Sequence, residues 1–266
     1  MSKPSTMLDK VWAQHVIVAR PGGEELLFVD LNLVHEGGTF LAFDQMRAEG
    51  RKVRKLKQTL AVTDHYLPSL NRAAGAAGIV NPEIRNVVVW LDQHVREFGL
   101  EHIGMNDPRQ GITHVIGPEL GLTQPGLLIT CCDSHTATQG ALGALAMPIG
   151  QSTQLRHVLT TQTLWQKKPK TLRITIDGAL PPHVTAKDVI LSVIARIGIG
   201  GAVGHAVEYA GSTIRRMSIE GRLTVCNMSI EAGARIGMIA PDDATYEYLQ
   251  GRPYAPRNAD WDRALE

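Results

Sequence analysis

The chain has 266 residues, of which 44% are hydrophobic and 20% are charged, a composition typical of soluble globular proteins. Its 27 basic and 26 acidic side chains leave a formal net charge of +1. This balance argues against a dedicated nucleic-acid binder, whose surface carries an excess of Lys and Arg. The three cysteines, none of them in a C-x-x-C pair, exclude the disulfide scaffold of a small secreted protein.

The sequence also carries no membrane or secretion signal. No stretch approaches the roughly 18 consecutive apolar residues that a membrane span requires. Residues 1–16 lack the apolar segment of a signal peptide. We therefore expect a cytoplasmic protein that does not contact membranes and whose cysteines are reduced.

The first hundred residues predict two helices and two buried strands. Apolar residues at helical spacing predict helices over 5–16 and 82–98, the second with a proline in its first turn. Short apolar runs predict buried strands over 26–34 and 59–63. The basic segment 51–57 between them is either a phosphate site or a solvated loop, and the neutral overall charge favours the loop.

The remainder of the chain continues the alternation of strands and helices. The segment 127–130 predicts a buried strand, and the small, glycine-rich segment 140–150 predicts a helix packed close to the sheet. Alternating apolar residues over 172–176 predict a half-buried strand. Thr185 and Asp188 then form the capping-box pattern that begins a helix.

Strands that alternate with helices predict an α/β fold with a largely parallel sheet. The pattern changes after the basic segment 167–170, where we place a domain boundary. The predicted organisation is a first α/β domain over residues 1–168 and a second, smaller one over 169–266.

Polar residues follow two of the predicted strands. Asp64 and His65 stand where one strand stops, and Asp133, Ser134 and His135 follow another. Ligands of parallel α/β sheets bind outside the carboxyl ends of the strands, so these groups are candidates for catalysis. The structural alternatives are a simple turn at 64–65 and a helix cap made by the Asp and the Ser of the second group.

Three further residues carry a functional and a structural interpretation each. His114 lies in an apolar segment and is either catalytic or a core histidine. Asn227 and Glu231 have the i, i+4 spacing of one helix face, although Glu231 is alternatively a surface residue beside Arg235. No His or Cys cluster has metal-ligand spacing, and no phosphate-binding glycine motif follows a strand.

Ten segments, in order along the chain, together resemble the aconitase superfamily and, more closely, the large subunits of 3-isopropylmalate dehydratases. They span nearly the whole chain, which makes the resemblance far more specific than any one motif. The segments are VDLNLVHE (29–36), GRKVRK (50–55), TDHYLP (63–68), NDPRQGITHVIGPELGLTQPG (106–126), CDSHTAT (132–138), HVLTTQT (157–163), VTAKDVIL (184–191), VEYAG (207–211), EGRLTVCNMSIEAGAR (220–235) and GRPYAP (251–256).

The resemblance implies three-layer α/β/α domains and a hydro-lyase activity, the dehydration and rehydration of a 2- or 3-hydroxy acid. In this family a [4Fe–4S] cluster acts as a Lewis acid on the departing hydroxyl group. By position, Asp64 and His65 resemble the pair that protonates this hydroxyl. His114 with Asp133 resembles a pair that steers the cluster-bound water.

The resemblance assigns the remaining candidates in the same way. His135 with Glu231 resembles a second pair that steers water and hydroxyl. Ser134 resembles a contact to a substrate carboxylate. Asn227 resembles a residue that lies close to the cluster.

The cysteines depart from the family pattern. Cys131 and Cys226 match non-ligand positions, and Cys132 stands where a Gly is common, so the cluster ligands of the family are absent from these residues. We therefore expect a chain that ends before the cluster domain. Its expected partners are a cluster-bearing domain or chain, a small subunit that carries the swivelling domain, and a small hydroxy acid.

Two functional hypotheses follow. The first is a large-subunit part of a 3-isopropylmalate dehydratase-type enzyme, in leucine biosynthesis or acting on a different hydroxy acid. The second is an inactive paralogue that serves as a binding or assembly module. Leu41 supports the second, because it stands where the family has a Gln.

Overall fold

The computed structural model describes residues 5–261, and its central element is a five-stranded parallel sheet of order β5–β4–β3–β6–β7. The apolar runs predicted as strands over 59–63 and 127–130 form β4 and β6, whose residues are all buried. Strands buried on both faces are typical of parallel sheets covered by helices. The strands are β3 (Leu31–His35), β4 (Thr59–Val62), β5 (Glu101–Ile103), β6 (Leu128–Cys131) and β7 (Leu145–Pro148).

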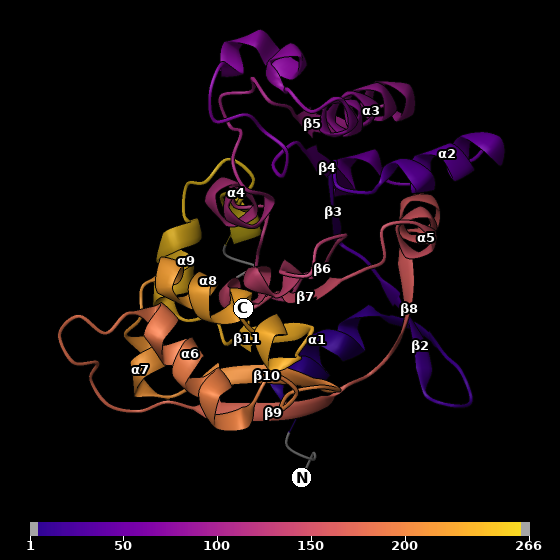
Figure 1. The fold of residues 1–266 in the computed structure, drawn as a ribbon. Helices are drawn as coiled ribbons and strands as arrows, with labels where there is room; N and C mark the ends of the chain where they lie inside the picture. Colours follow the sequence, from indigo (N-terminus) through magenta and orange to yellow (C-terminus); the bar gives the residue numbers. More distant parts are fainter. Residues whose placement is uncertain (1–4, 262–266) are drawn as a thin grey trace.

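Helices cover both faces of this sheet. Figure 1 shows α2, α3 and α5 on one side of it and α4 on the other. The core agrees: Phe43, Leu91 and Leu155 pack with one face of the sheet, and Ile116 packs with the opposite face. The predicted α/β fold with α/β/α layers is therefore confirmed. The helices are α2 (Phe40–Ala48), α3 (Pro82–Phe98), α4 (Thr113–Leu120) and α5 (Thr153–Thr161).

A second parallel sheet has the order β11–β10–β9 and its own helices. The predicted capping box is present, because Thr185 and Asp188 exchange hydrogen bonds at the start of α6. The elements are β9 (Lys170–Thr175), α6 (Ala186–Ile197), β10 (His205–Ala210), α7 (Ser212–Arg215), α8 (Ile219–Asn227), β11 (Ile236–Ile239) and α9 (Asp243–Leu249).

A small antiparallel sheet, β1–β2–β8, stands beside the larger one. It consists of β1 (Val16–Ala19), β2 (Glu24–Phe28) and β8 (Thr163–Lys167), and it follows α1 (Met7–His15). Although α1 begins the chain, it lies beside the second sheet (Figure 1), where the Leu8 amide donates to the Glu208 carboxylate over 3.1 Å. Within residues 5–261, no helix combines the length and apolar character needed to cross a bilayer.

The single strand predicted over 26–34 is wrong, because the chain changes sheets within it. β2 pairs with β8, and β3 pairs with β4 and β6. The change occurs at Asp30, whose carboxylate accepts the Leu128 amide over 2.7 Å and also contacts His15. The apolar residues on both sides of Asp30 carry no sign of this change, although β2 is only partly buried and β3 is buried throughout.

The helix predicted over 140–150 is also wrong. The segment Thr136–Leu142 is a 3-10 helix that ends at Gly143 (φ +83°), and β7 follows it and pairs with β6. The small residues serve a different contact. A Cβ atom on Gly140 would lie 1.8 Å from the backbone oxygen of Gly237 in β11. Only glycine at position 140 therefore lets the 3-10 helix Thr136–Leu142 pack this closely against β11.

We predict that Gly140→Ala destabilises the fold. The obstructing atom is a backbone oxygen, which cannot rotate away, so we expect a loss of about 1–3 kcal/mol in the free energy of unfolding, or more. Urea unfolding measures it. Gly200→Ala is the matched control, because nothing lies within 4 Å of its added Cβ. Equal stability of the two variants would contradict the prediction.

Candidate active site

Three adjacent parallel strands end at one place. β3 lies between β4 and β6 in the sheet, so the residues that follow these strands meet at one edge. These residues are His35, the last residue of β3, and Glu36 directly after it, Asp64 and His65 after β4, and Asp133 after β6. We call them, together with His114, His135 and Glu231, the strand-end cluster.

The carboxylate of Asp133 is the centre of the strand-end cluster. Its Oδ1 accepts the Nε2–H of His114 over 2.8 Å and the backbone N–H of His135 over 2.7 Å. Its Oδ2 accepts from His65 Nε2 over 3.0 Å. Burial alone would raise the pKa of Asp133, but the hydrogen bonds from His114 and His65 hold it well below its usual range. Asp133 is therefore a carboxylate at any physiological pH.

His65 lies between two carboxylates. Asp133 contacts its Nε2, and Asp64 contacts its Nδ1. Hydrogen bonds to Asp133 and then Asp64 raise the pKa of His65 to about 10. At neutral pH the ring is thus an imidazolium with an N–H directed at each carboxylate, and its side chain is 35% exposed.

Asp64 also positions the next helix. Its Oδ2 accepts the backbone N–H of Thr113, the first residue of α4, over 2.7 Å. Burial would raise the pKa of Asp64, but the hydrogen bonds from His65 and Thr113 lower it. Because His114 is the next residue, this contact places it against Asp133.

His35 supports His65 from beneath. The two rings stack with centroids 4.1 Å apart and planes 13° apart. Nδ1 of His35 accepts the backbone N–H of Gly37 over 3.0 Å, and its Nε2 lies 3.1 Å from the Cys132 carbonyl. These two contacts fix the plane of the ring on which His65 stacks.

Glu36 belongs to the strand-end cluster, but the sequence patterns did not predict it as a candidate. Its carboxylate is 1% exposed and accepts three successive backbone N–H groups, from Asp64 (3.0 Å), His65 (2.7 Å) and Tyr66 (2.8 Å). It therefore fixes the turn that presents His65. The available signal was its place directly after a buried strand, the same position that singled out Asp64.

His114 is buried, yet it belongs to the site. Besides its bond to Asp133, its Nδ1 lies 3.4 Å from the Nε2 of Gln139, a fully buried amide. His114 also lines a pocket of about 420 Å³ that Thr138 and Asn227 share. The side-chain amide of Asn227 donates to the Thr138 hydroxyl over 2.9 Å.

His135 and Glu231 form a contact between the two parallel sheets, because His135 follows β6 and Glu231 precedes β11. His135 Nε2 and Glu231 Oε1 lie 3.1 Å apart, and both side chains are more than a third exposed. The exposed hydroxyl of Ser134 lies 3.1 Å from His135 Nδ1. The expectation that Asn227 and Glu231 share a helix face is wrong, because α8 ends at Asn227 and Glu231 lies in the separate 3-10 turn Ile230–Ala232.

The cysteines do not fit a [4Fe–4S] cluster, which is held by cysteine thiolates arranged around one cluster. Cys131, Cys132 and Cys226 are at most 3% exposed, and each packs in a different apolar cluster of the core. Burial raises the pKa of Cys131 and of Cys226, which keeps these thiols protonated, whereas the hydrogen bond with Cys131 lowers the pKa of Cys132.

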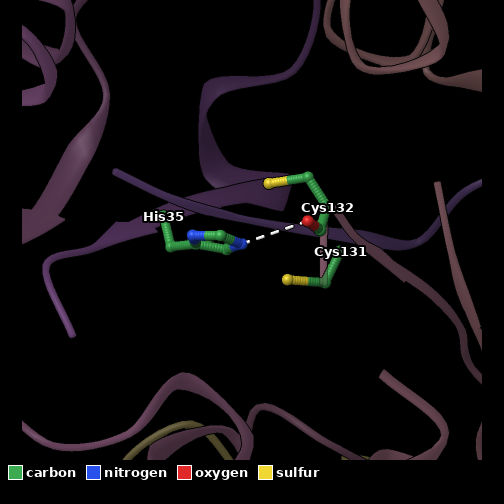
Figure 2. A group of neighbouring side chains, drawn as sticks. All are labelled: His35, Cys131 and Cys132. Carbon is green, nitrogen blue, oxygen red and sulfur yellow. Dashed lines mark hydrogen bonds between the residues drawn. The ribbon is translucent and has the colours of Figure 1, made fainter. Parts of the chain in front are cut away.

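His35, Cys131 and Cys132 form the one compact group that includes two thiols among residues 5–261, with candidate ligand atoms within 4.8 Å of one another. Figure 2 shows the His35 ring directed at the Cys132 carbonyl, with a thiol on either side. A histidine binds a metal ion through the lone pair of a ring nitrogen that carries no proton and accepts no hydrogen bond. Here Nδ1 is occupied by Gly37 and Nε2 carries the proton, so the group does not suit a metal ion.

A comparison with protein families finds a match that covers almost the whole chain. The family model described as "Aconitase family (aconitate hydratase)" matches residues 9–266. The match includes every residue of the strand-end cluster.

We predict that Glu36→Gln destabilises the 64–66 turn. The amide group carries no negative charge, and its NH2 faces a backbone donor, so we expect a loss of about 1.5–3 kcal/mol in the free energy of unfolding. Urea unfolding measures it, with Glu247→Gln, at an exposed position of α9, as the control. A variant as stable as this control would show that Glu36 does not brace the turn.

We predict a pH-dependent contribution of His65 to stability. Its pKa rises on folding from the ordinary value of 6.5 to about 10, so the stabilisation is complete below about pH 6.5 and is lost as the pH rises towards 10. The measurement is unfolding of wild type and His65→Gln across this range, with an NMR titration of the His65 ring. Asp133→Asn should lower the pKa of His65. A wild-type ring that titrates near 6.5 would contradict the prediction.

Proposed function

The chain belongs to the aconitase family, and on that premise we propose that the strand-end cluster handles the water and hydroxyl group in a hydro-lyase reaction on a 2- or 3-hydroxy acid. Such a reaction breaks a C–O bond, removes a proton from the neighbouring carbon and releases water. The observation that supports the proposal best is the convergence of three paired groups on one strand edge: His65 with its two carboxylates, His114 with Asp133, and His135 with Glu231.

His65 is the proton donor in this proposal. A departing hydroxyl leaves more readily when an acid protonates it, and general acid catalysis of this kind contributes about 10²–10⁴-fold. A substrate hydroxyl that replaces Asp133 at Nε2 of His65 would receive that proton. Asp64 stays on Nδ1 and keeps the ring oriented during the transfer.

The other cluster members hold the ligand. His135 and Glu231 are accessible and adjacent, so they can orient a water molecule through one donor and one acceptor. The exposed hydroxyl of Ser134 is suited to a substrate carboxylate. Asn227 stands at the neighbouring pocket with His114, where it is proposed to lie close to a cluster that a partner supplies.

For the reaction in the cell we propose the 3-isopropylmalate type, in leucine biosynthesis and in the cytoplasm. The proposed partners are a small subunit with the swivelling domain, which would contribute the base for carbon deprotonation, and a domain or chain that holds the [4Fe–4S] cluster. The resemblance of the ten segments supports this choice over other hydroxy acids.

A second candidate function is binding of a hydroxy acid without turnover. Two observations favour it. The cysteines do not fit a cluster, and Leu41, which replaces an amide of the family, is 48% exposed and offers no hydrogen bond from its side chain. A site with these changes retains its histidines and carboxylates, and in this second proposal these groups bind the acid.

The test is turnover by the protein isolated from its source cell with the subunits that co-purify, under anaerobic conditions. 3-Isopropylmalate, citrate and homologous hydroxy acids are the substrates, and the ultraviolet absorbance of the unsaturated product is the signal. We expect turnover of 3-isopropylmalate that falls about 10²-fold or more in His135→Asn and Glu231→Gln. His183→Asn, at an exposed turn, is the control and should retain full activity.

Each outcome decides between the candidates. Turnover of another acid with the same variant pattern keeps the hydro-lyase and rejects the 3-isopropylmalate assignment. Binding of these acids without turnover selects the second candidate. Turnover that His135→Asn and Glu231→Gln leave unchanged contradicts the role of the cluster.

A further inference from the structure

A second pocket lies at the amino-terminal ends of the strands of the second parallel sheet. It has a volume of about 410 Å³ and is lined by the residues at the amino-terminal ends of β9, β10 and β11. Lys170 begins β9, His205 begins β10, and Arg235 precedes β11. None of the strand-end cluster residues lines it.

The pocket concentrates positive charge. Lys167, Lys168, Lys170 and Arg235 line it, and no lining residue is acidic. Because the whole chain carries a net charge of only +1, this is a local accumulation. Lys168 is neutralised by Asp9 at 2.5 Å, which leaves three cations that face the pocket without a carboxylate partner among residues 5–261.

Arg235 is an exposed residue at the edge of the pocket. Its guanidinium donates to the Pro148 carbonyl over 2.5 Å, which holds one end of the group in place. Partial burial of the guanidinium lowers the pKa of Arg235. An anion in the pocket would accept hydrogen bonds from the remaining N–H groups.

The rest of the lining is apolar. Trp12, Met147 and Ile236 contribute to the wall, and each is at most 5% exposed. Pockets for small molecules are mostly apolar, with a few polar groups that fix the ligand's orientation, and they occupy about 300–1,000 Å³. The pocket has this composition, with cations as the polar groups.

We propose that this pocket is a binding site for a small organic anion that carries an apolar or aromatic group. The anionic end contacts Lys167, Lys170 and Arg235, and the apolar end contacts Trp12 and its neighbours. The site is separate from the strand-end cluster and does not depend on the proposed function.

Phenyl phosphate is the probe, and isothermal titration measures its affinity for the full chain. Lys167→Glu/Lys170→Glu should weaken binding by about ten-fold or more, because two contacts change from attraction to repulsion. The matched control is Lys55→Glu/Lys57→Glu, which alters the same charges at exposed positions outside the pocket. Inorganic phosphate should bind more weakly than phenyl phosphate, because it lacks the apolar group.

NMR locates the ligand. The chain has four tryptophans, so the indole N–H of Trp12 is assigned by elimination with Trp90→Phe, Trp165→Phe and Trp261→Phe. Phenyl phosphate should shift the Trp12 signal. Absence of binding, equal weakening in both double variants, or equal affinity for inorganic phosphate would overturn the proposal.

Discussion

The arrangement of the site depends on one carboxylate. Asp133 accepts hydrogen bonds from His65, His114 and the backbone of His135, which come from the end of β4, from α4 and from the end of β6. A carboxylate with this little solvent contact is stable only when its charge is compensated, and the imidazolium of His65 compensates it. The hydrogen bonds that stabilise the charge of Asp133 therefore also bring His65 and His114 together.

The sheet order makes this assembly possible. β3 lies between β4 and β6, and neighbouring strands are about 4.8 Å apart. A side chain that follows β3 can therefore reach the backbone of the turn that follows β4. Glu36 occupies that place and holds the backbone of the 64–66 turn. The glycine contact between Gly140 and Gly237 then brings the second sheet close enough for Glu231 to meet His135.

The sequence predicted much of this because strand ends are local features. Buried apolar runs located β4 and β6, and the polar residues after them were Asp64, His65 and Asp133. The sheet change at Asp30 could not be predicted, since it depends on which distant strand is the neighbour. The place of Glu36 after a buried strand was visible in the sequence, but its contact with the 64–66 turn depends on β4 being the neighbour of β3. Asn227 and Glu231 were misplaced on one helix because spacing does not show where α8 ends.

The central claim is that the strand-end cluster binds the hydroxy acid. The most direct test follows the ring signals of the ten histidines by NMR while citrate, a hydroxy acid, is added to the chain alone. The account predicts shifts for His65, His114 and His135, with His183 unchanged. Shifts confined to His205, which lines the basic pocket, or the absence of any shift would contradict it.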